Sequence, residues 1–306
     1  MRGSDDRSKH TSREGCIMTH VELVLETIEL LGHWELEMAS RRLSPRTIKE
    51  RVRFVRYLDA TLGPAVHLGE DDLRSFLADC SRTKAATTQF NYHVVIRMWF
   101  QWLQQRGFRT DDPTISLGTP RLPRMQPRPA LTDHLDAVLR AGNLEVQTKM
   151  KVLLAALQGM RCIEISRLRG EDVDLAAMRI RIIGKGDTDI TNDLHSTVAD
   201  HARAHGSYFP RRGWWFPSPI DPSKHVLPAS VSKVLSEAFR RVGAPVTAHQ
   251  LRHWTATELI RKDVPTRVVQ KIMRHSSIQT TEGYSAVADD TSAAALRRLP
   301  SLIVGN

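Results

Sequence analysis

The chain has 306 residues, of which 41% are hydrophobic and 25% charged, a balance typical of a globular protein with room for two domains. Its formal net charge of +10 favours a polyanionic partner. No run of about 18 apolar residues is present, which argues against a transmembrane helix and a membrane partner. The three widely spaced cysteines form neither a disulfide framework nor a metal-ligand cluster, and they favour a reducing cytoplasm.

The first part of the chain has the apolar spacing of helices. Residues 1–17 mix charges of both signs with no apolar segment behind them, which predicts a disordered leader and no signal peptide. Ser44-Pro45 is typical of an N-cap followed by proline at the first helical position. Residues 18–108 are therefore predicted to form a small all-α domain, with helices over His20–Arg42, from Pro45 onward, over Asp71–Cys80 and over Thr87–Arg106.

The second of these helices carries a basic stripe, which is formed by Arg46, Lys49, Arg53 and Arg56. These residues recur at helical spacing on a different face from the apolar residues. Four cations in a row predict a track of contacts to DNA phosphates. The alternative is an ordinary solvated face.

Residues 109–129 contain five prolines and the basic residues Arg121, Arg124 and Arg128. Proline stiffens an extended chain, so this segment is predicted to be a basic linker between two domains. Such a connector suits a protein that closes around a duplex. A linker that is basic merely to stay solvated fits the sequence equally well.

Residues 130–306 are predicted to form a mixed α+β domain. Residues Met178–Ile183 alternate apolar and basic side chains, which indicates a half-buried strand, and after a glycine turn Thr188–Thr191 is the expected return strand. The whole fold is therefore mainly α with a small antiparallel sheet. Helices are expected from Thr132 onward and over Met150–Gln158, Ser230–Val242, Gln250–Ile260, Thr266–Met273 and Ala293–Arg298.

The second domain also contains the residues that indicate chemistry. His249 and Arg252 stand three apart and are followed by His275 and Tyr284. This set suits attack by a phenol on a phosphodiester, because the transition state gains negative charge and the phenol must lose its proton. Taken alone, each of these residues is more often structural or solvated than catalytic. Their combination is what indicates a site.

The motifs resemble the signature of the tyrosine recombinases, the phage integrase family. The likeness runs from about residue 20 to residue 290, so both predicted domains fit it. It rests on Gly-Met-Arg-Cys-Ile-Glu-Ile-Ser around Arg161, Ile-Gly-Lys-Gly around Lys185, His-Gln-Leu-Arg-His with His249 and Arg252, Arg-His-Ser-Ser with His275, and Tyr284.

The resemblance implies a role for each residue. Tyr284 is expected to attack the scissile phosphate and to hold the 3′ end as a phosphotyrosine, while Arg161 and Arg252 grip the non-bridging oxygens. Lys185 is the implied general acid for the departing 5′ oxygen. His249 exchanges a proton with the tyrosine, and His275 donates a hydrogen bond to the phosphate. No cofactor, ATP or metal is implied, because the ester keeps the energy of the broken bond.

Two features depart from the family pattern. Arg274 stands where the family commonly has glycine before the second histidine, and Asp187, Asp189 and Asp193 surround the lysine turn, where basic residues are usual. Glu164 is interpreted as a structural partner of the arginine motif.

The resemblance predicts a site-specific recombinase of the two-domain Xer and Cre layout, an integrase of a phage or another mobile element. Its implied partner is double-stranded DNA, bound by a homotetramer on two sites. One alternative is a type IB topoisomerase-like enzyme. The other is a non-catalytic DNA-binding protein of the same fold.

Overall fold

The computed structural model describes residues 20–122, 127–183 and 189–274. The chain forms two compact units, Met1–Arg124 and Met125–Asn306, which we call the N-terminal unit and the C-terminal unit. The division falls within the segment predicted to be a linker. None of the helices in the described ranges has the length and apolarity needed to cross a bilayer.

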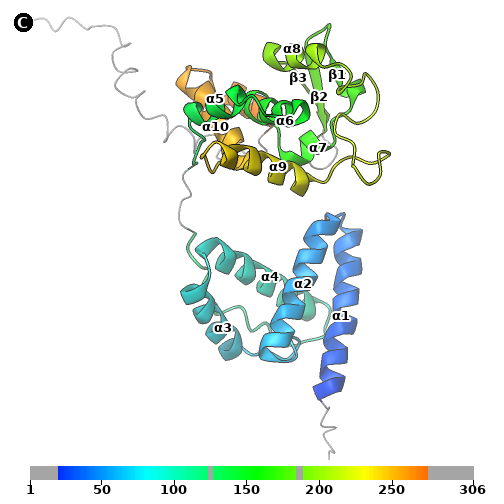
Figure 1. Ribbon diagram of the computed structural model, residues 1–306. Coiled ribbons are helices and arrows are strands. Elements are labelled where there is room, and N and C mark those ends of the chain that lie inside the picture. Colours follow the sequence, from blue (N-terminus) through cyan, green and yellow to red (C-terminus); the bar gives the residue numbers. More distant parts are fainter. Residues whose placement is uncertain (1–19, 123–126, 184–188, 275–306) are drawn as a thin grey trace, which may run out of the picture. The chain divides into compact units, whose positions relative to one another are not determined.

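The described part of the N-terminal unit is helical, as predicted (Figure 1). Ser44 caps the second helix by accepting a hydrogen bond from the Thr47 amide at 3.2 Å, and Pro45 stands at the first helical position. The helices are α1 (His20–Ser40), α2 (Pro45–Leu62), α3 (Glu70–Thr83) and α4 (Ala86–Gln105).

Tryptophans form the centre of this unit. The ring centroids of Trp34 and Trp99 lie 5.2 Å apart, and those of Trp99 and Trp102 lie 5.4 Å apart. All three side chains are buried, so they form part of the core of this unit.

The first part of the predicted linker packs onto the N-terminal unit. Arg109 donates hydrogen bonds to the carbonyl oxygens of Val66 and Leu68, and Leu117 is buried in the core. Residues 109–117 thus contribute to the helical unit.

The C-terminal unit is mixed, with an antiparallel sheet of order β1-β2-β3 beside a group of helices (Figure 1). Ile180 and Ile182 of β2 are buried while their neighbours are exposed, which is the alternation that the sequence indicated. The elements are α5 (Thr132–Arg140), α6 (Val146–Leu157), α7 (Cys162–Ser166), a 3₁₀ turn (Gly170–Asp172), β1 (Val173–Asp174), β2 (Arg179–Ile183), β3 (Asp189–Asp193), α8 (Ser196–Ala204), α9 (Pro228–Arg241), α10 (Ala248–Arg261) and α11 (Thr266–Met273).

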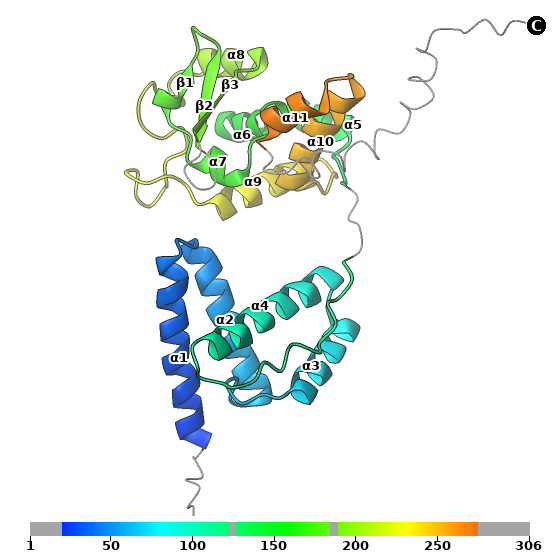
Figure 2. The same ribbon diagram turned by 180° about the vertical axis from the view of Figure 1, so that it is seen from behind.

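Helix α6 is the centre of this unit and packs against α8, α9 and α10. Eight of its residues are buried, so it is apolar on most sides. Figure 2 shows α11 and α10 alongside it. These contacts bring the turn after α6, which holds the Arg161 motif, next to the ends of α10 and α11.

Some elements differ from the sequence-based expectation. Helix α6 begins at Val146 rather than Met150, and β3 extends to Asp193. Helix α8 was missed, because its buried residues are Val198 and two alanines and give little apolar periodicity. The predicted helix Ala293–Arg298 lies outside the described residues.

Candidate active site

Helix α10 carries His249 and Arg252, and a capping box fixes where it begins. The Thr247 hydroxyl accepts a hydrogen bond from the Gln250 amide at 3.4 Å, while the Gln250 side chain accepts one from the Thr247 amide at 2.9 Å. His249 therefore lies in the first turn, and Arg252 follows three residues later on the same side.

Arg252 is a buried cation, with 3% of its surface exposed. Its guanidinium donates hydrogen bonds to the carbonyl oxygens of Gly159 and Met273. These carbonyls belong to the turn after α6 and to the end of α11. Arg252 thus joins the turn before α7 to the end of α11.

Arg161 precedes α7 and is held by the carboxylate of Glu164. The Arg161 amide donates to Glu164 Oε2 at 2.8 Å, and its Nη1 donates to Glu164 Oε1 at 2.8 Å. The Glu164 side chain is 1% exposed, whereas that of Arg161 is 42% exposed. One edge of the Arg161 guanidinium is therefore fixed, while the side chain stays accessible to an anion.

Gly159 allows this turn to approach α11. Its φ of +55° lies in the left-handed region that favours glycine, and a Cβ atom there would lie 2.8 Å from the Met273 sulfur. A side chain at this position would therefore strain the backbone and require the end of the Met273 side chain to shift.

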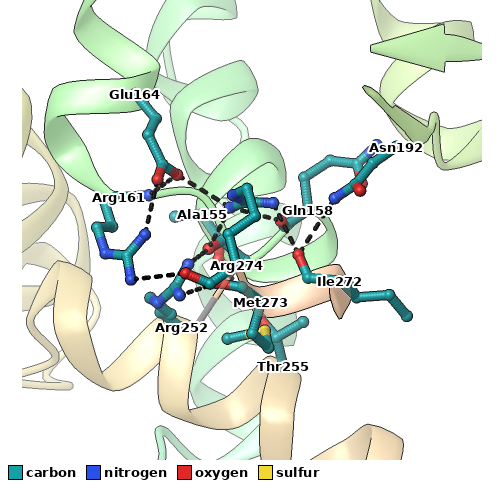
Figure 3. Close-up of polar contacts among 11 residues, drawn as sticks. Ala155, Gln158, Arg161, Glu164, Asn192, Arg252, Thr255, Ile272, Met273 and Arg274 are labelled. Atoms are coloured by element: carbon teal, nitrogen blue, oxygen red, sulfur yellow. Dashed lines mark hydrogen bonds and ion pairs between the residues drawn. The ribbon is translucent and has the colours of Figure 1, made fainter. Parts of the chain in front are cut away.

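The last carbonyls of α11 receive side-chain donors from several elements (Figure 3). Asn192 of β3 donates to the Ile272 carbonyl at 3.1 Å, and Arg161 donates to the Arg274 carbonyl at 3.4 Å. Together with Arg252 on Met273, these bonds satisfy carbonyls that a helix end leaves unpaired. They also place cations at the negative end of the helix dipole.

His249 lies close enough to both arginines for their charges to affect it. Partial loss of hydration lowers the pKa of His249, and the charges of Arg252 and Arg161 lower it further. The neighbouring His253, whose ring centroid is 4.1 Å away, has its pKa lowered to about 4, first by burial and then by His249 and Arg252. Both imidazoles are thus neutral at neutral pH, and a neutral imidazole nitrogen can accept a proton.

In the sequence, Arg274 stood out only as a departure from the family pattern, but it is part of this site. Its side chain is 3% exposed and its Nη2 lies 2.9 Å from Glu164 Oε2. Burial raises the pKa of the Glu164 carboxyl, but the charge of Arg274 and the bonds from Arg161 outweigh this, so the pKa lies below its usual value. Glu164 is therefore a buried carboxylate shared by two arginines.

Lys185, His275 and Tyr284 lie outside the described residues. Lys185 belongs to the segment between β2 and β3, whose last described pair is Ile183 with Asp189. Two acidic residues of this hairpin have basic partners within the sheet: Asp189 Oδ2 lies 3.4 Å from Arg181 Nη1, and Asp193 Oδ1 lies 3.7 Å from Arg179 Nε. Both carboxylates are exposed, and Asp187 lies outside the described residues.

The predicted DNA-binding residues of α2 are all exposed. Arg46 and Arg53 line a groove of about 860 Å³ between α2 and α4, whereas Lys49 and Arg56 do not. Sequence analysis missed the other polar residues of this groove, which include Lys84, Asn91 and Tyr92. They share no motif, and only the packing of the two helices brings them together.

The linker arginines are only partly described. Arg121 and Arg128 are exposed, and Arg124 lies outside the described residues. Within the described ranges, no group of three or more His, Cys, Asp and Glu side chains is arranged to hold a metal ion.

Comparison with known proteins identifies the family. The model of the phage integrase family matches residues 129–291. A tyrosine recombinase from Thermosipho africanus (strain TCF52B) is 28% identical over 271 residues, which cover 85% of this chain and 95% of the relative. The integrase from mycobacterium phage Brujita is 35% identical, covers 91% of this chain and 95% of its own, and has a TM-score of 0.47.

The fold of the chain is also found in solved structures of other proteins. A lambda integrase tetramer bound to a Holliday junction shares it with a TM-score of 0.69 at 16% identity, over 83% of this chain and 75% of that one. The arrangement is thus that of the lambda integrase class, mainly helical with a small antiparallel sheet. The chain belongs to the phage integrase family of tyrosine recombinases, enzymes that cut and rejoin DNA.

Proposed function

We propose that the protein is a site-specific recombinase that cuts DNA through a 3′-phosphotyrosyl ester on Tyr284 and serves as the integrase of a phage or another mobile element. The observation that carries the proposal is the convergence of Arg161 and Arg252 at the end of α11, with His249 close enough to both for their charges to lower its pKa. The family's description as phage integrases supports the role in a mobile element.

The cleavage step follows from the chemistry of these side chains. The Tyr284 oxygen attacks phosphorus while the bond from phosphorus to the 5′ oxygen breaks. The phenol proton passes to His249, and Lys185 supplies a proton to the departing 5′ oxygen. The ester preserves the energy of the phosphodiester, so a 5′ hydroxyl reverses the step without ATP.

The arginines have different parts in this step. The exposed Arg161 guanidinium is accessible to a phosphate, whereas Arg252 is nearly enclosed and is fixed by two carbonyls. Donors fixed in advance need no reorganisation when negative charge develops on the phosphate, which is why they stabilise a transition state. His275 follows Arg274 directly in the chain and adds a further hydrogen-bond donor to the phosphate.

We assign the DNA grip to the basic stripe of α2, to the groove beside it and to the linker arginines. Arg46, Arg51, Arg53 and Lys84 line this groove with one acidic residue, Glu50, which is paired with Arg53 at 2.8 Å. The lining is therefore basic on balance, and such a surface can bind phosphates without reading sequence. Double-stranded DNA is the partner, and the neighbours solved on DNA support this assignment.

Exchange between two sites requires two cuts on each duplex, and therefore four active subunits. We assign a homotetramer on two DNA sites, and the lambda integrase neighbour, a tetramer bound to a Holliday junction, supports this assignment. The free thiols of Cys80 and Cys162 fit a reducing cytoplasm, where the DNA lies.

The proposal is tested by trapping the ester. Fragments of DNA flanking this gene, each carrying random nicks, are incubated with the protein and denatured in detergent. Cleavage beside a nick releases a short strand with a 5′ hydroxyl, so the covalent adduct accumulates, and sequencing of the bound DNA yields the site. We expect an adduct from the wild type and none from Tyr284→Phe.

Failure to form any adduct on these fragments would contradict the proposal and favour a non-catalytic DNA-binding protein. Two linear duplexes carrying the recovered site then separate the remaining alternatives. A recombinase joins strands from different duplexes, whereas an enzyme that only relaxes supercoils restores each duplex.

A further inference from the structure

Arg274 has an unusual backbone for an arginine. Its φ of 53° lies in the left-handed region, and it forms the C-cap of α11. A side chain with a Cβ atom adopts this conformation at an energetic cost. Contacts elsewhere in the residue must therefore compensate.

These contacts come from the guanidinium. Its Nη1 donates to the Ile272 carbonyl at 2.7 Å, and its Nη2 lies 3.1 Å from the Gly159 carbonyl oxygen and 2.9 Å from Glu164 Oε2 (Figure 3). The side chain thus folds back from the end of α11 across the turn that precedes α7.

Arg274 and Arg161 meet on opposite sides of one carboxylate. Oε2 of Glu164 receives Arg274 Nη2 and the Arg161 amide, while Oε1 receives Arg161 Nη1. The side chains of Glu164 and Arg274 are 1% and 3% exposed, so water cannot replace either partner. The orientation of the carboxylate, and with it that of Arg161, therefore depends on Arg274.

We propose that Arg274 is a positioning residue for DNA cleavage, which holds Glu164 and thereby fixes the exposed guanidinium of Arg161 where it grips the phosphate. The inference rests on the function proposed above. We assign Arg274 no direct contact with the phosphate, because its guanidinium already bonds to Glu164 and to the Ile272 and Gly159 carbonyls. Its guanidinium fixes the end of α11 through hydrogen bonds to the Ile272 and Gly159 carbonyls.

Substitutions at Arg274 separate the effect of its side chain from that of its left-handed backbone. If only the left-handed turn mattered, Arg274→Gly would be as active as the wild type or better, because glycine adopts this conformation without strain. If the guanidinium matters, Arg274→Gly and Arg274→Met both cleave DNA more slowly than the wild type. Arg274→Lys, which keeps a positive charge near Glu164, then recovers part of the rate.

The measurement is single-turnover cleavage of the nicked site recovered by trapping, with DNA affinity measured in parallel. We expect Arg274→Met and Arg274→Gly to lower the cleavage rate about 10- to 100-fold, within the range for a lost charge-stabilising donor. DNA affinity should stay within about 2-fold, because the proposal assigns Arg274 no contact with DNA. Arg267→Met, which removes an exposed arginine of the same helix, should cleave at the wild-type rate.

A double-variant cycle with Glu164→Gln tests whether Arg274 acts through Glu164. Arg274→Met should slow cleavage less in the Glu164→Gln background than in the wild type, because no buried anion is then left with an incomplete set of partners. The urea midpoint of unfolding should show the same coupling. Equal effects in both backgrounds would overturn the proposal, since Arg274 would then act independently of Glu164.

Two other results separate this inference from the proposed function. A normal cleavage rate for the folded fraction of Arg274→Met, with active enzyme counted by adduct yield, would overturn the positioning role and leave the recombinase assignment intact. Absence of an adduct from the wild type would refute the proposed function, and the positioning role would fall with it.

Discussion

The arginines on α2 of the N-terminal unit and those at the end of α11 in the C-terminal unit are placed in opposite ways. In the N-terminal unit, Arg46, Arg53 and Arg56 are exposed on α2, where Arg53 forms a solvent-exposed ion pair with Glu50. In the C-terminal unit, Arg252 and Arg274 are enclosed and donate to backbone carbonyls. The same side chain therefore contributes a diffuse positive surface in one unit and fixed donors in the other.

This difference follows from what each task requires. Binding a polyanion depends on total charge and releases counterions, so exposed cations suffice and their exact positions matter little. Stabilising one transition state depends on donors that are already in place. The expected consequence is that variants of α2 change affinity and its salt dependence, while variants at the end of α11 change rate.

The largest effect is expected at the proposed nucleophile. Tyr284→Phe removes one oxygen and should abolish the covalent adduct on the nicked site, while DNA affinity stays nearly unchanged. The measurement is adduct yield in denaturing gels beside a filter-binding curve. An adduct of normal yield would assign the nucleophile to another residue.

The next largest effect is expected at Lys185. If this lysine protonates the 5′ oxygen, Lys185→Ala should slow cleavage by roughly 10² to 10⁴. A 5′-bridging sulfur leaves as a stable thiolate and needs no proton, so this substrate should restore most of the rate to Lys185→Ala and little to Arg161→Ala. Equal defects on both substrates would mean that Lys185 only contacts DNA.

Alanine variants of Arg161 and Arg252 should lose similar amounts of cleavage rate but different amounts of unfolding free energy. Either alanine variant should lower the cleavage rate by roughly 10²-fold or more. Arg252→Ala leaves two carbonyls without this donor and should cost about 1–3 kcal/mol for each that stays unpaired. Arg161→Ala leaves Glu164 with Arg274, so its unfolding free energy should fall less. Urea unfolding of both variants measures the difference.

The features that sequence predicted are those set by neighbours in the chain. The N-cap at Ser44 with Pro45 and the alternation through Ile180 and Ile182 both follow from a local pattern. The grouping of His249 with Arg252 is local as well, because one helix turn places them together.

The features that sequence could not predict depend on distant contacts. Arg252 is fixed by Gly159, 93 residues away, and Arg274 by Glu164, 110 residues away. No periodicity in either segment encodes these pairs, and an arginine at the end of a short helix is usually solvated. The glycine missing before His275 was the only trace of the Arg274 arrangement in the sequence.

A smaller effect is expected from the basic stripe. Replacing both Arg46 and Arg53, which line the groove, by glutamate should flatten the salt dependence of DNA affinity. The effect should be larger than that of replacing both Lys49 and Arg56 by glutamate. Each lost phosphate contact should lower the slope of log affinity against log salt by about 0.9. An unchanged slope in both double variants would show that α2 presents a solvated face, and equal slopes would remove the groove from the interface.

The smallest effect concerns one carboxylate in each unit. Glu164 has a lowered pKa, and so does Glu37, through its bonds from Arg106 and Trp102. A carboxyl whose folded pKa is depressed stabilises the fold above its unfolded pKa of about 4.3, and this stabilisation is lost as pH falls through the folded value. Unfolding free energy should therefore decrease below about pH 4.3, and less so in Glu164→Gln and Glu37→Gln.

Glu37→Gln and Glu164→Gln should differ in their DNA cleavage rates. Glu37 holds helices of the N-terminal unit together, since its carboxylate receives Arg106 of the α4 C-cap and Trp102 of α4, so Glu37→Gln should cleave at nearly the wild-type rate at pH 7. Glu164→Gln loosens the carboxylate that orients Arg161 and should cleave more slowly at the same pH. Single-turnover rates decide this. Equal loss in both variants would mean that rate follows general stability, and the contrast between diffuse and fixed arginines would fail.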